Sequence, residues 1–77
     1  MPTSALNGKL LWFNPQKGYG IIRPNDLTAD DVYCPASALQ GDQYQYGENV
    51  EVLYHAEQQL SGMVATSVWK VVKDNES

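Results

Sequence analysis

Residues 12–22 hold the side chains of this chain that are best suited to binding chemistry. The stretch reads WFNPQKGYGII and combines aromatic rings with one lysine and two glycines. Flat rings stack on unpaired bases, a lysine attracts phosphates, and glycines let a ligand or a neighbouring backbone come close. These residue types at this spacing are typical of a surface that holds single-stranded nucleic acid.

Short strands must position these side chains, because the chain shows alternating rather than helical patterns of apolar residues. We expect strands at residues 5–13, 18–23, 31–36, 50–55 and 63–72. The fourth strand has the clearest alternation, with Val52 and Tyr54 on a buried face and Glu51 and Leu53 on the other face.

Turn-forming residues separate the expected strands. We expect turns at residues 14–18 and 24–26, a loop at 37–47 and a hairpin loop at 57–62. We interpret Asn7 and Gly8 as an interruption of the first strand or a bulge in it. Five short strands with short connections favour an all-β barrel over a sandwich. The prediction is one domain of residues 5–73, with flexible termini at 1–4 and 74–77.

The charge of the chain argues against a typical nucleic-acid binder. The formal net charge of the 77 residues is −4 at pH 7. Proteins that bind nucleic acid are usually basic, since neutralising phosphates supplies most of their non-specific affinity. However, Lys9, Lys17 and Arg23 all lie in the first third of the chain. We therefore predict a weakly basic face on an acidic domain.

Several functional classes are not expected. Cys34 is the single cysteine and His55 the single histidine, so the sequence predicts no internal disulfide, no metal site, no cofactor and no catalytic histidine cluster. An enzyme is therefore not expected. No apolar run approaches the roughly 18 residues of a membrane span, so we expect a cytoplasmic protein that makes no membrane contact.

Strand alternation predicts which rings share a face. Tyr19 and Ile21 point to the same side of the second strand, and Tyr33 on the third strand is expected beside Tyr19. Trp12 or Phe13 would extend this platform. The alternative is that the rings are core residues, as in many small β domains. The core can be supplied by other residues, namely Leu10, Ile22, Val32, Val50, Val52, Val64 and Val68.

The chain resembles the cold-shock domain family. The resemblance runs through GKLLWFN (residues 8–14), KGYGII (17–22), DVY (31–33) and SALQ (37–40). It implies a small five-stranded antiparallel barrel of the oligonucleotide-binding type. It also implies binding of single-stranded RNA or DNA with low sequence specificity, in many members as an RNA chaperone, and no enzymatic activity.

The resemblance also implies a set of nucleic-acid-binding residues. In this set, aromatic rings contact bases and lysines contact phosphates. One apolar residue stands where the family has a ring, and polar side chains complete the surface. Matched to the family's motifs, these residues are Lys9, Trp12, Phe13, Asn14, Lys17, Tyr19, Ile21, Asp31, Tyr33 and Tyr44.

The second motif departs from the family pattern. The family reads aromatic-Val-His-Phe, whereas this chain has Cys34, Pro35 and Ala36 after Tyr33. Ile21 also replaces a phenylalanine, and a family lysine is Leu11 here. Each lost stack should remove about 1–3 kcal/mol of binding free energy. We therefore predict weak binding, and we expect Pro35 to end or bend the third strand.

An alternative function uses the same fold without nucleic acid. The barrel could serve as a protein-interaction module or a homodimer through an apolar face. The residues expected on that face are Leu11, Ile21, Ala36 and Leu53. Two further residues are assigned structural roles: Trp69 is expected to cap the barrel with its indole, and His55 to be a solvated strand residue.

Overall fold

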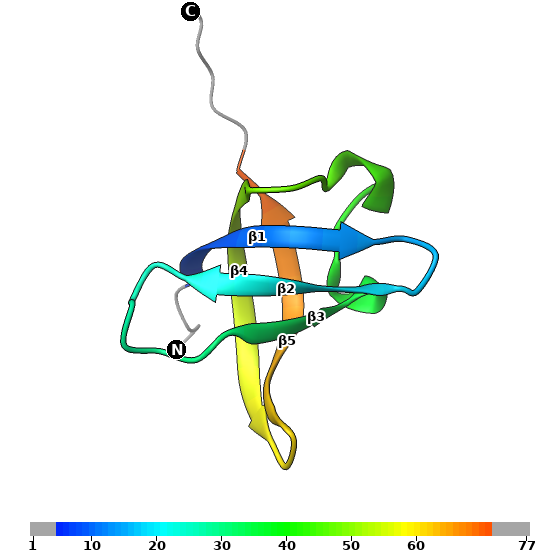
Figure 1. Cartoon of the computed structure of the whole chain (residues 1–77). Coiled ribbons are helices and arrows are strands. Elements are labelled where there is room, and N and C mark those ends of the chain that lie inside the picture. The colour runs from blue at the N-terminus through cyan, green and yellow to red at the C-terminus, as the bar shows by residue number, and fades with distance from the viewer. Residues whose placement is uncertain (1–4, 72–77) are drawn as a thin grey trace, which may run out of the picture.

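The computed structural model describes residues 5–71, and this part of the chain folds into a closed β-barrel. Its strands are β1 (Leu6–Asn14), β2 (Tyr19–Pro24), β3 (Val32–Pro35), β4 (Val50–Gln59) and β5 (Gly62–Lys70). The strand order is β1-β2-β3-β5-β4, and β1 pairs with both β2 and β4 (Figure 1). The predicted five-stranded all-β barrel is confirmed. The contact between β3 and β5 that closes it is parallel, and the other pairings are antiparallel.

The described strands differ from the predicted ones mainly in the second half of the chain. The predicted hairpin at 57–62 is confirmed, but its loop is shorter than predicted, because β4 continues to Gln59 and β5 begins at Gly62. Gly62 has a φ of 126°, which a residue with a side chain rarely adopts, so the connection needs only two residues. The predicted loop at 37–47 contains most of one short 3-10 helix, η1 (Ala36–Ala38), and all of another, η2 (Gln43–Gln45). The predictions for residues 1–4 and 72–77 lie outside the described residues.

The predicted interruption or bulge at Asn7 and Gly8 is wrong. Both residues pair regularly with β4, and the irregularity of β1 lies further along, between Leu10 and Trp12. Gly8 is needed for packing, because a Cβ there would lie 2.9 Å from the Arg23 carbonyl oxygen and 2.9 Å from the Tyr54 ring. A glycine inside a strand here marks close approach of neighbouring groups rather than a bulge.

The core fills the barrel with the inward residues of every strand. Two predicted core residues, Val50 and Val64, are only half-buried. Val50 still packs against the core at the start of β4, whereas Val64 points outward, opposite Tyr33 on β3 and Glu57 on β4. The buried residues are Leu10, Phe13, Ile22, Val32, Cys34, Ala38, Leu39, Tyr46, Val52, Tyr54, Ala65 and Val68. Tyr46 was not foreseen in the core. Its hydroxyl lies 2.7 Å from the Gln40 carbonyl oxygen and 3.3 Å from that of Val68, and it thereby anchors the loop before β4 to β5.

Because Cys34 is buried, we expect the free energy of unfolding to fall at alkaline pH. Burial raises the pKa of the thiol to about 12, whereas an exposed thiol ionises near pH 9. The folded state therefore keeps its proton between pH 9 and about 12 while the unfolded state loses it. Stability from this group is complete below pH 9 and falls as pH rises through that window. Burial raises the pKa of Tyr46 and Tyr54 in the same direction.

Urea unfolding at about pH 8 and about pH 10.5 measures this effect through the free energy of unfolding. We expect a clear loss at the higher pH, and a smaller loss in Cys34→Ala, which keeps the two tyrosines. Equal losses in the two proteins would show that the thiol does not contribute.

Candidate nucleic-acid interface

A bulge in β1 decides which aromatic residue faces outward. Leu10 points into the core opposite Ile22, and strict alternation would send Trp12 inward as well. The irregularity between Leu10 and Trp12 adds one residue to β1, so that Trp12 lies opposite Ile21 and points outward. Phe13 then points inward and is 8% exposed. The sequence left open whether Trp12 or Phe13 extends the platform, and the bulge selects Trp12.

Three rings meet on the outer face of β1, β2 and β3. The ring centroids of Trp12 and Tyr19 lie 5.4 Å apart at an interplanar angle of 71°. Those of Tyr19 and Tyr33 lie 5.6 Å apart at 22°, which is a stacked pair. Trp12 is 37% exposed and Tyr33 43% exposed. We call Trp12, Tyr19 and Tyr33 the aromatic triad; the expected neighbourhood of Tyr19 and Tyr33 is thus confirmed.

Ile21 lies in the same face between two members of the triad. It pairs with Trp12 on β1 and with Tyr33 on β3, and its side chain is half-buried. It therefore forms an apolar floor for the face but offers no ring for stacking.

Phe13 does not belong to this face, although it was expected there. Its ring is part of the core cluster, and it packs where Gly20 of β2 comes close. A Cβ on Gly20 would overlap the Trp12 carbonyl oxygen and lie 2.9 Å from the Phe13 Cα atom. Gly20 is thus needed so that β1 and β2 can approach each other.

Asn14 and Lys17 belong to the turn between β1 and β2. The Asn14 side-chain oxygen accepts hydrogen bonds from the backbone N–H groups of Gln16 (2.9 Å) and Lys17 (3.2 Å). The Gly18 N–H donates to the Asn14 carbonyl oxygen at 2.7 Å, and Gly18 has a φ of 79°. Asn14 therefore holds the turn that presents the exposed Lys17 at the end of the aromatic face.

The altered second motif ends β3 beside the triad. As predicted, β3 ends at Pro35, which lies directly opposite Tyr19 on β2. The next residue, Ala36, donates its N–H to the Gly18 carbonyl oxygen at 2.8 Å and packs against the core. Where the family pattern has two rings, this chain has a half-buried proline and a half-buried alanine.

Four charged residues form a row across the other end of the face. Lys9 lies between Glu51 on β4 and Arg23 on β2, and the Arg23 Nε atom is 3.7 Å from the Asp31 carboxylate. The order of charges along the row is therefore acidic, basic, basic, acidic. From sequence, Glu51 was not included among the residues of this face. The pattern predicted that Glu51 points outward, but not that it lies beside Lys9 of β1. Both carboxylates reduce the attraction of Lys9 and Arg23 for phosphates.

Tyr44 lies apart from the triad. It is 73% exposed on η2, where its backbone N–H donates to the Asp42 carboxylate at 2.9 Å. Within residues 5–71 its ring contacts none of the triad rings. Its place in the loop keeps it available for a further base, but the structure does not join it to the face.

The expected apolar face for a protein partner does not form as one surface. Ile21 lies on β2 within the aromatic face, whereas Leu53 lies on β4 opposite Trp69 of β5. Ala36 packs against the core, and Leu11 is half-buried at the bulge. Sequence spacing could not show this, because the direction of each residue depends on which strands are neighbours.

Other kinds of site were also sought in the described part of the chain. Residues 5–71 contain no group of three or more His, Cys, Asp and Glu side chains arranged to hold a metal ion. Among the same residues, no helix has the length and apolar character needed to cross a membrane.

A closed five-stranded barrel that presents stacked rings on its second and third strands has the architecture of oligonucleotide-binding barrels. The chain belongs to the cold-shock domain family: the model of the 'Cold-shock' DNA-binding domain matches residues 6–71. The chain itself is 40% identical over 67 residues to the cold shock-like protein CspJ of Salmonella typhi, and the match covers 86% of this chain and 94% of that protein. It is 38% identical over 65 residues to the major cold shock protein of Micrococcus luteus, covering 83% and 96%. For CspI of Escherichia coli K12 the identity is 36%, covering 86% and 94%.

Proposed function

We propose that this protein binds single-stranded RNA or DNA weakly, with low sequence specificity, and acts as an RNA chaperone. The observation that carries the proposal is the aromatic triad on the outer face of the barrel, in which the Tyr19 ring contacts both Trp12 and Tyr33. The family match supports the same conclusion. A cytoplasmic location fits the proposal, because RNA is abundant there.

Stacking supplies the binding energy in this proposal. Successive bases lie against Trp12, Tyr19 and Tyr33, and every base has a flat face that these rings accept. Lys17 at the turn and Lys9 at the opposite end of the face approach the phosphates. Stacking alone does not distinguish one base from another, so low specificity follows from the same geometry.

Binding should be weak for two reasons. Ile21, Pro35 and Ala36 supply no rings, and each lost stack removes about 1–3 kcal/mol. The net charge of −4 also weakens the attraction for phosphates. The triad therefore remains as the main source of affinity.

A fluorescence titration tests the proposal. In Trp69→Phe, the single remaining tryptophan is Trp12, so its emission reports on the aromatic face alone. We expect oligothymidine to quench this emission at low salt, and rising salt to weaken the binding. If Trp12 emission does not change at high micromolar oligonucleotide in low salt, the proposal fails.

Removing a carboxylate from the charged row should strengthen binding. We expect Asp31→Asn to tighten binding up to about five-fold, because it frees Arg23 from a surface ion pair worth about 0–1 kcal/mol. The gain should be largest at low salt and should shrink as salt rises. Titrations of oligothymidine at two salt concentrations measure both effects.

Glu57→Gln is the matched control, since it removes the same charge from an exposed site on β4 that lies outside the row. It should change affinity less than Asp31→Asn does. Weaker binding by Asp31→Asn would instead show that the carboxylate itself contacts the nucleic acid.

A further inference from the structure

A second exposed tryptophan lies on the other side of the barrel, on β5. Trp69 was expected to cap the barrel, but its indole lies on the outer face, 38% exposed. The His55 ring of β4 meets it edge-on, with centroids 5.3 Å apart and an interplanar angle of 84°. His55 is thus half-buried against the indole rather than simply solvated.

This pair repeats the arrangement of Trp12 in the aromatic triad. Trp12 is 37% exposed, and Tyr19 meets it edge-on at 5.4 Å and 71°. In both places one ring holds an indole in a fixed orientation while more than a third of its surface stays open. A fixed and partly exposed indole loses little conformational freedom when a base stacks on it.

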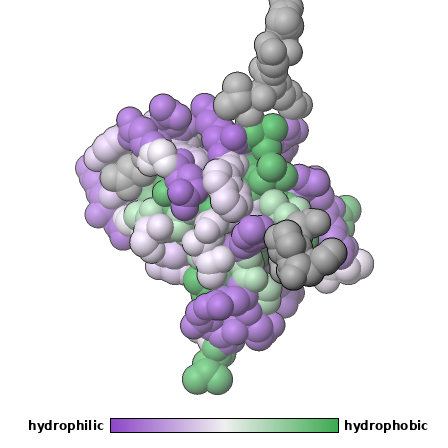
Figure 2. All heavy atoms as spheres, turned by 180° about the vertical axis from the view of Figure 1, so that it is seen from behind, coloured by the Kyte–Doolittle hydropathy of each residue, from purple (hydrophilic) through white to green (hydrophobic). Residues whose placement is uncertain are grey.

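The neighbours of Trp69 make a shallow apolar and polar surface. Leu53 lies directly opposite Trp69 on β4, and Asn7 of β1 lies opposite Leu53 on the other side. Ser67 lies opposite His55. The barrel seen from behind is not uniformly hydrophilic, since pale and green atoms run between purple ones (Figure 2).

Strand β1 connects this surface to the aromatic face. Trp12, Lys9 and Asn7 all lie outward along β1, which pairs with β2 on one side and β4 on the other. From Trp12 to Asn7 the strand advances about 16 Å, and Trp69 lies two strands, or about 10 Å, further on. These lengths fall within the reach of a bound single strand, because site sizes of such barrels run from about 4 to about 16 nucleotides.

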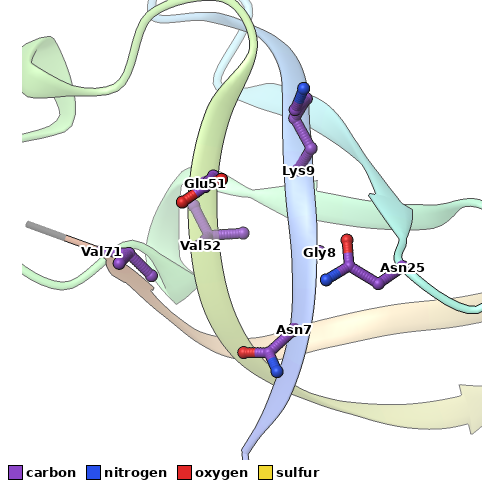
Figure 3. A pocket seen from close by; sticks show the side chains of 7 residues that line it. All are labelled: Asn7, Gly8, Lys9, Asn25, Glu51, Val52 and Val71. Carbon is purple, nitrogen blue, oxygen red and sulfur yellow. The ribbon is translucent and has the colours of Figure 1, made fainter. Parts of the chain in front are cut away.

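A polar hollow of about 320 Å³ lies along this path between β1 and β4. Figure 3 shows Asn7 and Lys9 on β1, with Asn25 beside them and Glu51 and Val52 on β4. The amides of Asn7 and Asn25 offer hydrogen bonds to sugars and phosphates, and Lys9 offers a positive charge at the end near the triad. Glu51 disfavours phosphates on its own side, so the path runs along the β1 side of the hollow.

We propose that Trp69, held by His55, is a second stacking site that takes an unpaired base of the same strand after it leaves the aromatic triad. The proposal rests on the proposed function, because it extends the path of the same ligand. It predicts that a short oligonucleotide occupies only the triad, whereas a longer one reaches Trp69.

Single-tryptophan variants test the two sites separately. Trp12→Phe leaves Trp69 as the only tryptophan, and Trp69→Phe leaves Trp12. The probes are oligothymidines of about 4 and about 16 nucleotides, the two ends of the range of site sizes. We expect both probes to quench Trp12, and only the longer one to quench Trp69. Anisotropy of the longer probe gives the concentration at which Trp12→Phe is saturated. If the longer probe quenches Trp12 in Trp69→Phe but leaves Trp69 unchanged in saturated Trp12→Phe, this inference is wrong and the proposed function stands. If neither tryptophan responds, the proposed function itself fails.

Affinity measurements give a second readout. Trp69→Ala should weaken binding of the longer probe by about 5- to 150-fold, the range for removal of one stacking ring, and leave the shorter probe unaffected. Leu60→Ala is the control, since Leu60 is an exposed apolar residue at the tip of the same hairpin. Equal affinity of Trp69→Ala and the parent for the longer probe would overturn the inference. So would a Trp69 signal that depends on protein concentration without oligonucleotide, which would identify the surface as a contact between copies of the chain.

Discussion

Replacing Tyr19 with alanine is expected to cause the largest loss of nucleic-acid affinity of any single change on the aromatic face. Tyr19 is the one ring that contacts both other members of the triad, at 5.4 Å from Trp12 and 5.6 Å from Tyr33. The variant loses the stack on Tyr19, worth about 1–3 kcal/mol. It also loses two ring contacts of about 0.5–1.5 kcal/mol each, which hold the remaining rings in place. We expect affinity to fall by at least about 10-fold.

Anisotropy of a labelled oligothymidine measures this loss without relying on Trp12, whose surroundings the substitution changes. Two variants serve as controls. Tyr19→Phe keeps the ring and should bind almost as well as the parent, because stacking does not need the hydroxyl. Tyr44→Ala removes a more exposed tyrosine that contacts no triad ring, and its loss should be confined to one stack at most.

The outcome of this series can contradict the assignment in two ways. Parent-like binding by Tyr19→Ala would show that the triad does not carry the affinity. An equal loss in Tyr19→Phe and Tyr19→Ala would show that the hydroxyl, and therefore a hydrogen bond to the ligand, matters more than the ring.

The approach of Tyr19 and Tyr33 could be predicted from sequence because it depends on short-range rules. Alternation sets Tyr19 and Tyr33 outward, and antiparallel pairing of consecutive strands is the commonest connection. In the structure Tyr33 pairs with Ile21 and Tyr19 with Pro35, so the two rings meet diagonally across the ladder. Diagonal neighbours are still within reach of long side chains.

The direction of Trp12 and Phe13 could not be predicted in the same way. The two residues are adjacent, both aromatic and both compatible with either face. Their directions depend on one extra residue between Leu10 and Trp12, and no glycine or polar residue marks that bulge in the sequence. A shift of one residue exchanges the two faces of a strand. Because the bulge was not predicted, Phe13 was assigned to the surface, whereas it lies in the core.

Pairings between distant parts of the chain were beyond sequence reasoning for a related reason. The charged row needs Glu51 of β4 beside Lys9 of β1, and the path towards Trp69 needs Leu53 of β4 beside Asn7 of β1. Alternation gives the side of each residue, but the register between strands far apart in sequence comes from how the barrel closes. Likewise, nothing in the loop marks Tyr46 as the residue that reaches the Val68 carbonyl oxygen.

Substituting Gly20 with alanine should have the largest effect on stability. The added Cβ would overlap the Trp12 carbonyl oxygen and lie 2.9 Å from the Phe13 Cα atom, so backbone rather than a flexible side chain must move. Overpacking usually costs about 1–3 kcal/mol, and a backbone clash lies at the upper end or beyond it. A domain of 77 residues has about 4–12 kcal/mol of total stability. We therefore expect a fall in melting temperature of about 12 °C or more, from about 4–8 °C per kcal/mol.

Gly47→Ala is the matched control for Gly20→Ala. A Cβ at Gly47 has no atom within 4 Å, and the residue is not among the glycines with positive φ. The change should alter stability by less than about 1 kcal/mol, with a small gain if the unfolded chain loses freedom. Thermal unfolding followed by circular dichroism compares the two variants directly. Equal melting temperatures would show that β1 and β2 can separate at Gly20 at no cost.

Gly20 also ties the stability of the barrel to the proposed binding face. The carbonyl that the new Cβ displaces belongs to Trp12, and Phe13 on the other side of the same backbone is a core residue. A movement of β1 away from β2 therefore has two effects at once: it opens the core at Phe13, and it shifts the Trp12 ring away from Tyr19. If Gly20→Ala still folds at low temperature, we expect it to bind oligothymidine more weakly than the parent, although no ring has been removed. Parent-like affinity in the folded variant would mean that the spacing of β1 and β2 does not control the triad.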